Sequence, residues 1–557
     1  MSSSTNSPGL KTPLEMLYHW ETSHPDKIYL RQPVDGVFQK YSWAQVGQKV
    51  RRLASALIAQ NFEQGSHIAI LSKNCAEWFI ADLAIMMAGH VSVPIYATAG
   101  QETIQYVLNH SHCRAIFIGK LDDTNNQCDA IPANVKRLGF PYPNVERAEV
   151  SLDYQWAELQ AQPPHPGNPV PALEDTMTII YTSGSTGNPK GVVNTFGAYA
   201  FASQQFVTTV GFHDKDRALS YLPLAHITER TVVEGASFYA GCEISFVESL
   251  DTFVDNLKAV SPTLFLSVPR LWTRFQMGVL AKMPPKKLNL LLNIPLLNKI
   301  VARKIRQQLG LDSARMFGSG SAPLSSATIR WYERIGVNIT EAWGMSETNA
   351  LGTNCHPYRS DKVGTIGKAY PGVELRIADD GEIQVRGDFL MKEYYLEPEK
   401  TAEVFTSDGY LRTGDKGEID ADGYVKITGR LKEIFKTAKG KYVAPVPIES
   451  KLMENPLIEQ VCVTGSDLKQ PIALVVLAED AKAHDQEHIQ SSLERTLAKT
   501  NAKLESHAVL DGIMIVQEAW TPDNGLLTPT LKIRRHLLEG RYQDAIKQPL
   551  NTPVIWL

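Results

Sequence analysis

The chain has 557 residues, which is too many for one compact core, so a large domain and a smaller one are expected. It is 43% hydrophobic and 21% charged, the composition of an ordinary globular protein. Its 56 basic and 60 acidic residues give a formal net charge of −4, which removes any general electrostatic case for binding nucleic acid.

The cysteine pattern and the start of the chain indicate a reducing cytoplasm. The six cysteines contain no C-x-x-C pair, so neither a disulfide framework nor a zinc site is predicted. The polar start, residues 1–9, lacks the apolar segment of a signal peptide. No run of about 20 apolar residues could span a membrane. Oligomeric state cannot be inferred from the sequence.

Strands and helices alternate in the first part of the chain. The apolar spacing of Tyr41–Ile58 predicts a capped amphipathic helix, and Glu77–Gly89 predicts a mostly buried one. Short β-branched runs predict strands at His67–Leu71, Val91–Tyr96 and Ala115–Gly119. This rhythm favours a mostly parallel sheet covered by helices on both faces.

A loop rich in glycine and hydroxyl groups follows the predicted strand Met177–Tyr181, and a helix is expected to start near Asn194. Such a loop offers N–H groups and hydroxyls to a polyphosphate, and Lys190 adds a positive charge. It is not a Walker A loop, because Pro189 stands where that motif needs glycine. The alternative is a flexible surface turn.

The run Ser-Gly-Ser-Thr-Gly-x-Pro-Lys-Gly, residues 183–191, resembles the signature loop of the AMP-forming adenylate ligases. That superfamily contains acyl-CoA synthetases, luciferases and peptide-synthetase adenylation domains. The resemblance implies that the loop holds the β- and γ-phosphates of ATP. The residues concerned are Thr182, Ser183, Gly184, Ser185, Thr186, Gly187 and Lys190, with Thr182 also near the metal.

The segment Leu222-Pro-Leu-Ala-His226 matches one that lies, in the superfamily, between the nucleotide and the carboxylate pocket. Taken alone, His226 would be a structural histidine. Its continuation to Arg230 resembles the long-chain fatty-acid branch. Further on, Lys286–Arg306 mixes leucines with basic residues, which predicts either two packing helices interrupted at Pro295 or peripheral contact with an anionic membrane.

Two motifs are assigned to the nucleotide by resemblance. The turn after Arg315-Met-Phe is not G-x-G-x-x-G, because Pro323 replaces the third glycine. The corresponding turn in the superfamily covers the adenine. An aromatic ring can stack on a base, a hydroxyl can bind phosphate and a carboxylate can hold Mg²⁺. The implied nucleotide residues are Gly320, Ser321, Ala322, Trp343, Gly344, Met345 and Ser346, with Glu347 as the metal ligand.

The end of the chain supplies the remaining residues of the resemblance. Asp415 accepts the ribose hydroxyls, a role that suits an acceptor-only carboxylate, and Arg430 reaches ribose or phosphate. Lys432 is the hinge, and Gly440 lets the CoA thiol approach closely. Lys532, in Leu-Thr-Pro-Thr-Leu-Lys, resembles the catalytic lysine in its long-chain form, although Leu531 replaces the usual glycine.

The resemblance implies an α/β fold. A large domain, residues 1–429, would contain doubly covered, mostly parallel sheets and a small β-barrel-like subdomain. A hinge at 430–432 would lead to a small mobile α+β domain, 433–557. The implied activity is ATP- and Mg²⁺-dependent ligation of a carboxylic acid, above all a long-chain fatty acid, to CoA, with Lys532, His226 and Lys190 catalytic.

Three alternatives stay open. One is a fatty acyl-AMP ligase that loads a carrier protein, and another is a ligase for a medium-chain or aryl acid. The third, from a different class, is a non-catalytic nucleotide-binding regulator.

Overall fold

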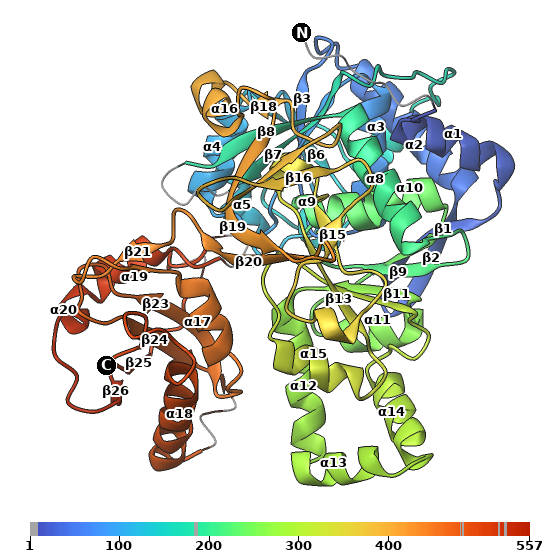
Figure 1. Ribbon diagram of the computed structural model, residues 1–557. Helices are drawn as coiled ribbons and strands as arrows, with labels where there is room; N and C mark the ends of the chain where they lie inside the picture. The colour runs from blue at the N-terminus through green and yellow to red at the C-terminus, as the bar shows by residue number, and fades with distance from the viewer. Residues whose placement is uncertain (1–8, 183–187, 480, 482–483, 522–523, 529–531) are drawn as a thin grey trace.

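The computed structural model describes the whole chain except residues 1–8, 183–187, 480, 482–483, 522–523 and 529–531. The described part is α/β, with several mixed sheets in a large N-terminal portion and a smaller sheet in a separate C-terminal lobe (Figure 1). The predicted fold class is therefore confirmed. Among the described residues, no helix is long and apolar enough to cross a membrane.

The largest sheet has seven strands, and two of them, β7 and β8, flank the predicted phosphate loop in the sequence. From β7 to β6 its neighbouring strands are parallel, whereas β8 and β18 run antiparallel. In spatial order the strands are β18 (Glu393–Tyr394), β8 (Lys190–Thr195), β7 (Thr176–Thr182), β4 (Val91–Ile95), β3 (His67–Leu71), β5 (Ala115–Ile118) and β6 (Lys136–Gly139).

The helices of the first part of the chain bury the apolar residues that the sequence predicts to be buried. Ser42 caps α2 with its side chain, and every residue of α3 is buried, as its apolar composition requires. The helices are α1 (Pro13–Ser23), α2 (Trp43–Ile58), α3 (Ala76–Met87), α4 (Gln101–His110), α5 (Thr124–Cys128), α6 (Pro143–Glu146), α7 (Trp156–Gln160), α8 (Phe196–Val210), α9 (Ile227–Glu229), the π-helix η1 (Arg230–Gly235) and α10 (Ala236–Ala240).

The helix expected near Asn194 is confirmed, but the sequence did not predict the strand β8 that precedes it. The β-branched pair Val192 and Val193 continues an antiparallel hairpin with β7, and α8 starts only at Phe196, capped by Thr195. Thr182 and Lys190 face each other across the two strands, so they fix the two ends of the loop.

Two further sheets, of four and five strands, belong to the large N-terminal portion. The first has the order β2 (Val37–Ser42), β1 (Ile28–Val34), β10 (Glu243–Phe246) and β9 (Arg217–Ser220). The second has the order β11 (Leu264–Ser267), β12 (Met316–Ser319), β13 (Ile339–Trp343), β14 (Thr353–Asn354) and β15 (Lys368–Ala369). The associated helices are α11 (Phe253–Val260), α12 (Pro269–Lys282), α13 (Pro285–Asn293), α14 (Leu297–Gln308), α15 (Ser326–Glu333) and the 3₁₀ turns η2 (Ser346–Thr348) and η3 (Ser360–Lys362).

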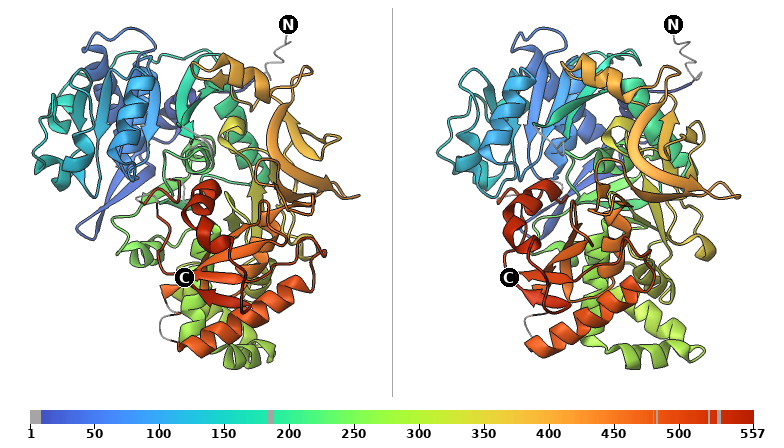
Figure 2. Two further views of the ribbon diagram at one scale, coloured as in Figure 1. Left: turned by 90° about the vertical axis from the view of Figure 1, so that its left-hand side faces the viewer. Right: turned by 60° about the vertical axis from the view of Figure 1, so that its left-hand side comes forward.

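Helices α12, α13 and α14 form a projection that we call the helical arm. In Figures 1 and 2 it extends from the body, with α13 crossing its far end, and α18 of the C-terminal lobe lies at the same end of the molecule. Pro295 separates α13 from α14, as predicted. At the base of the arm, Arg270 forms an ion pair with Glu459 of the C-terminal lobe.

An antiparallel sheet connects the large portion to the C-terminal lobe. Its strands are β16 (Glu374–Ile377), β17 (Glu382–Arg386), β19 (Leu411–Ile419) and β20 (Val425–Arg430), with α16 (Pro398–Val404) nearby. The chain leaves β20 at Arg430, so the predicted hinge at 430–432 lies at the end of a strand. The domain boundaries themselves stay a prediction.

The C-terminal lobe has its own core on both faces of one sheet. Alternate residues of β23 point to opposite faces: Val461 and Val463 pack in the cluster with α17 and α18, whereas Cys462 packs with Leu538 of α19. The elements are β21 (Phe435–Lys436), β22 (Tyr442–Val443), α17 (Pro445–Leu452), β23 (Ile458–Thr464), β24 (Ile472–Leu477), α18 (Gln486–Asn501), β25 (Ile513–Val516), α19 (Arg535–Arg541), α20 (Gln543–Ile546) and β26 (Val554–Trp556).

Candidate active site

Lys190 begins strand β8 at the mouth of the β7–β8 hairpin. Its ammonium group lies 4.4 Å from the centre of the Tyr394 ring, a cation–π contact. Desolvation lowers the pKa of Lys190, the negative charge of Glu347 opposes this, and the positive charge of Lys432 adds to it. Lys190 therefore belongs to one electrostatic neighbourhood with Glu347 and Lys432. The predicted phosphate-binding residues 183–187 lie outside the described residues.

Trp343 ends strand β13 and is locked in place by Asp415. Its indole Nε1 donates a hydrogen bond to Asp415 Oδ2 at 2.8 Å, and both side chains are buried. The ring lies against Gly352, where an added Cβ would stand 2.5 Å from it. Next to Trp343, a Cβ on Gly344 would lie 2.3 Å from the carbonyl oxygen of Ala350, so only glycine fits. The turn is thus tightly fixed.

Asp415, in β19, contacts Trp343 at the end of β13 and Arg430 at the end of β20. Its partner across strands β19 and β20 is Arg430, whose Nε lies 2.8 Å from Asp415 Oδ1. Attraction by Asp415 raises the pKa of Arg430. A carboxylate oxygen accepts more than one hydrogen bond, so Asp415 can hold Trp343 and Arg430 and still accept from a ligand hydroxyl.

Glu347 sits in the 3₁₀ turn η2, next to Ser346, and both side chains are buried. The hydroxyl of Tyr394 donates to Glu347 Oε1 at 2.8 Å. The same Tyr394 ring contacts Lys190, so one aromatic residue touches both the predicted metal ligand and the predicted phosphate-binding lysine. The sequence offered no signal for Tyr394: only the pairing of β18 with β8 brings it here.

Lys532 of the C-terminal lobe reaches the same place. Desolvation and the nearby charge of Arg430 lower the pKa of Lys532, whereas the carboxylates of Glu347 and Asp415 oppose that shift. Its main chain is held to Thr528, whose hydroxyl accepts from Lys532 N at 3.1 Å. The chain between these two residues lies outside the described part. Lys532 is therefore close both to Glu347, the predicted metal ligand, and to Asp415, the predicted ribose acceptor.

His226 is the fixed N-cap of α9, and its Nδ1 accepts from Thr228 N at 3.2 Å. Burial, together with the charge of Lys532, lowers the pKa of His226 to about 4, so the imidazole is neutral at pH 7. The next acidic residue, Glu229, accepts from Tyr221 N at 3.0 Å, and burial raises the pKa of Glu229 to about 8. His226 thus lies near Lys532 as a neutral group.

Arg230 anchors this segment in the protein core. Its guanidinium lies 2.5 Å from Asp82 of α3 and 2.7 Å from the Thr178 hydroxyl of β7. Glu234, one turn later, is 3.5 Å away. Because its charge is buried beside the carboxylates of Asp82 and Glu234, Arg230 is a structural residue that fixes His226 relative to the hairpin.

The remaining predicted residues lie in two turns. Gly320, Ser321 and Ala322 form a turn after β12, and a Cβ on Gly320 would lie 3.3 Å from the carbonyl oxygen of Ala342, so the turn borders β13. Gly440 lies in an exposed turn of the C-terminal lobe. No contact found in the described part of the chain connects Gly440 with Asp415.

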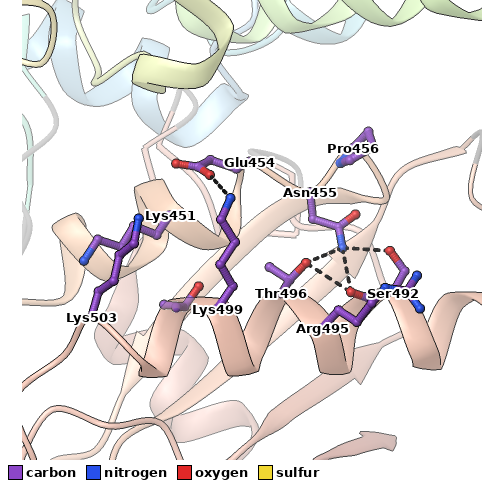
Figure 3. A pocket seen from close by; sticks show the side chains of 10 residues that line it. Lys451, Glu454, Asn455, Pro456, Ser492, Arg495, Thr496, Lys499 and Lys503 are labelled. Atoms are coloured by element: carbon purple, nitrogen blue, oxygen red, sulfur yellow. Dashed lines mark hydrogen bonds and ion pairs between the residues drawn. The ribbon is translucent and has the colours of Figure 1, made fainter. Parts of the chain in front are cut away.

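Two concavities accompany these residues. One, of about 750 Å³, lies between α4 and the hairpin, where Tyr181 and Pro189 face Arg534 of the C-terminal lobe. The other, of about 250 Å³, lies on the C-terminal lobe between α17 and α18 and is rich in lysine (Figure 3). It contains none of the predicted site residues.

Magnesium fits the residues that are present. Glu347 uses one carboxylate oxygen for Tyr394, which leaves its other oxygen for a cation, and Mg²⁺ commonly takes only one or two protein carboxylates and completes its shell with phosphates and water. No cluster of three or more His, Cys, Asp or Glu side chains that could hold a metal occurs within the described ranges. A resident, all-protein metal site is therefore not seen there.

Comparison with known proteins gives matches over nearly the whole chain. Residues 17–395 match the AMP-binding enzyme family and residues 433–552 match the AMP-binding enzyme C-terminal domain. The long-chain-fatty-acid–CoA ligase FadD15 of Mycobacterium bovis is 30% identical, over 96% of each chain. The peroxisomal long chain acyl-CoA synthetase 7 of Arabidopsis thaliana is 29% identical, over 97% of this chain and 86% of its own.

Among solved structures, ATP-bound MatB from Rhodopseudomonas palustris is similar, with a TM-score of 0.75 and 25% identity. The likeness covers 96% of this chain and 99% of that one.

Proposed function

We infer that this chain, which belongs to the AMP-binding enzyme family, is an ATP-dependent long-chain fatty-acid–CoA ligase. It joins the fatty acid to AMP, releases pyrophosphate and transfers the acyl group to the thiol of CoA. The observation that supports this function best is that Lys190 of the large portion and Lys532 of the C-terminal lobe both lie close enough to Glu347 to feel its charge, although they are far apart in the sequence.

The chemistry explains why cations must gather there. A carboxylate is a poor acylating agent because its leaving group is an oxide, and forming a mixed anhydride with AMP supplies a better one. The attack on the α-phosphate is in line and places negative charge on phosphoryl oxygens, so catalysis consists mainly of positioning and cationic stabilisation. We assign that stabilisation to Lys190 and Lys532, and the carboxylate pocket to the neighbourhood of His226.

The nucleotide is assigned to the wall formed by β13 and β19. Trp343 would provide the ring for adenine, together with the turn of Gly320, Ser321 and Ala322. Asp415 would accept the ribose hydroxyls, with Arg430 beside it. The hydrogen bond from Trp343 to Asp415 supports this assignment, because it sets the ring and the carboxylate at a fixed spacing before any ligand binds.

Magnesium would be held by Glu347, with Thr182 at the end of β7 close to the same phosphates. When bound, it neutralises charge on the phosphate oxygens. Ser346, next to Glu347, would contact the α-phosphate, with Gly344 and Met345 shaping the turn. The loop residues 183–187 would enclose the other phosphates.

The second half-reaction needs a different arrangement of the C-terminal lobe. In this structure Lys532 lies near Glu347 and Asp415, while Gly440 lies in an exposed turn of the same lobe. We propose that rotation about Lys432 withdraws Lys532 and brings the Gly440 turn to the acyl adenylate, as in hinge-type domain motions. CoA would then approach along that turn.

Pyrophosphate release, measured across acids of graded length with and without CoA, tests the function. We expect long-chain acids to be preferred and CoA to be consumed in equal amount to pyrophosphate. Preference for medium-chain or aryl acids would reassign the substrate, and turnover that needs a carrier protein in place of CoA would make the chain an acyl-AMP ligase. Absence of pyrophosphate release with every acid would favour a nucleotide-binding regulator.

We further propose a cytoplasmic enzyme that touches membranes peripherally through residues 286–306. Its proposed substrate favours this, because a long acyl chain partitions into bilayers.

A further inference from the structure

The helical arm belongs to a long stretch of one charge sign. Between Asp255 and Asp312 the sequence contains ten basic residues and no acidic one, although the chain as a whole has a net charge of −4. The local potential of the arm is therefore strongly positive. Blocks of like charge at one place attract an oppositely charged partner.

Most of these cations are free to act on a partner. Arg270 is paired with Glu459, and Arg306 donates to the carbonyl oxygen of Ile335, so these two have structural roles. Of the ten, the described part of the chain provides no ion pair or side-chain hydrogen bond for eight exposed ones: Lys258 and Arg274, and, in residues 282–304, Lys282, Lys286, Lys287, Lys299, Arg303 and Lys304.

The far end of the arm also exposes large apolar side chains. Leu290, Leu296 and Ile300 are 65%, 74% and 64% exposed, and Ile294 lies among them at 42%. They are not needed for internal packing, because other residues of the same helices, Leu288, Leu292, Ala302 and Ile305, already form the buried face. In Figure 1 this end of the arm points away from the body of the molecule.

We propose that the end of the helical arm, residues 282–304, docks on an anionic phospholipid bilayer. Leu290, Leu296 and Ile300 enter the boundary between headgroups and acyl chains, while the surrounding lysines extend to the phosphates. This deepens the proposed membrane contact and does not depend on the catalytic assignment. A second copy of the chain is a poor partner, because two positively charged arms repel each other. Nucleic acid would bind the lysines but would leave the exposed leucines without apolar contacts.

The position of the arm suits this role. Its base, at α12, belongs to the large portion of the molecule, so docking leaves the C-terminal lobe free to rotate once the ion pair between Arg270 and Glu459 opens. A docked enzyme would therefore keep its catalytic cycle while staying close to the bilayer in which its proposed substrate dissolves.

The test uses the full chain and sedimentation with vesicles of phosphatidylcholine, with or without phosphatidylglycerol. We expect binding to the anionic vesicles that weakens with added salt. Each lysine near an anionic surface contributes about 1 kcal/mol, which is about fivefold in partitioning, so the triple variant Lys286→Glu, Lys287→Glu, Lys299→Glu should bind about 100-fold less. Leu290→Gln with Ile300→Gln should lower binding by about tenfold or more.

A matched control changes the same charge elsewhere. The control is the triple variant Lys451→Glu, Arg495→Glu, Lys503→Glu, whose changed residues line the basic concavity of Figure 3. This variant should bind vesicles as the wild type does, within a few-fold. All variants should turn over a short, water-soluble acid at the wild-type rate, which shows that they are folded.

Equal binding to neutral and anionic vesicles would overturn the proposal. So would arm variants that bind as well as the wild type, or a control that loses as much binding as they do. Association of wild-type chains through the arm, without vesicle binding, would assign the surface to a second copy instead. Loss of pyrophosphate release with intact vesicle binding would count against the proposed function alone.

Discussion

Tyr394 provides the sharpest test of the site, because it contacts two proposed catalytic groups at once. Its hydroxyl donates to Glu347 at 2.8 Å, and its ring lies under the ammonium group of Lys190 at 4.4 Å. The variant Tyr394→Phe removes the first contact and keeps the second, whereas Tyr394→Leu removes both. The two variants therefore separate the metal side of the site from the phosphate side.

The size of the effect follows from the hydrogen bond. A bond to a charged acceptor is worth about 1.5–3 kcal/mol, and 1.36 kcal/mol is about tenfold in rate or binding. Glu347 is 9% exposed, so water can replace part of the lost contact, and the lower end applies. We expect Tyr394→Phe to raise the half-saturating Mg²⁺ concentration about tenfold. Tyr394→Leu should also raise the KM for ATP about threefold, through loss of the cation–π contact.

Pyrophosphate release titrated with Mg²⁺ and, separately, with ATP measures both effects. Tyr395→Phe is the matched control: the neighbouring ring faces His67 and His110, and its hydroxyl has no hydrogen-bond partner in the described ranges. If Tyr394→Phe keeps the wild-type Mg²⁺ dependence, or if Tyr395→Phe loses as much, the coupling of Tyr394 to Glu347 plays no part in catalysis.

Three other predictions follow from the same geometry. Lys532→Ala should abolish acyl-adenylate formation yet leave thioester formation from supplied acyl adenylate largely intact, and equal loss of both half-reactions would contradict the role of Lys532. Burial raises the pKa of Glu229 to about 8, so the folded state binds a proton that the unfolded state releases above about 4.5, and stability should fall as pH rises between these values. Glu229→Gln should flatten that fall in urea unfolding at pH 5 and pH 8, and an unchanged slope would show that Glu229 is not the titrating group. Arg230→Ala leaves Asp82 buried without its cation and should lower the free energy of unfolding by about 3–5 kcal/mol, read from the first thermal transition; a shift no larger than that of an exposed Arg330→Ala would show that the pair is not stabilising.

Local sequence patterns predicted much of the fold correctly. The strands at residues 67–71 and 115–118 and the capped helix α2 occur where the apolar spacing placed them. The β7–β8 hairpin was missed, because Val192 and Val193 are too short a run to be distinguished from the start of a helix. Only pairing with β7 on one side and β18 on the other reveals β8 as a strand.

The sequence by itself determined the chemistry available to this protein. A glycine-rich loop ending in Lys190, an aromatic residue three positions before a Ser-Glu pair and a lysine near the C-terminus indicate the family in chain order, because each motif needs only local residue types. The tertiary structure alone decided which groups touch. Tyr394 reaches Glu347 through a two-residue strand, and Lys532 of the C-terminal lobe lies near enough to Asp415 for that carboxylate to affect its pKa, over separations at which local spacing carries no information. The free apolar end of the helical arm is likewise a result of packing, since leucines of one short segment divide between the core and the surface only when the helices fold against their neighbours.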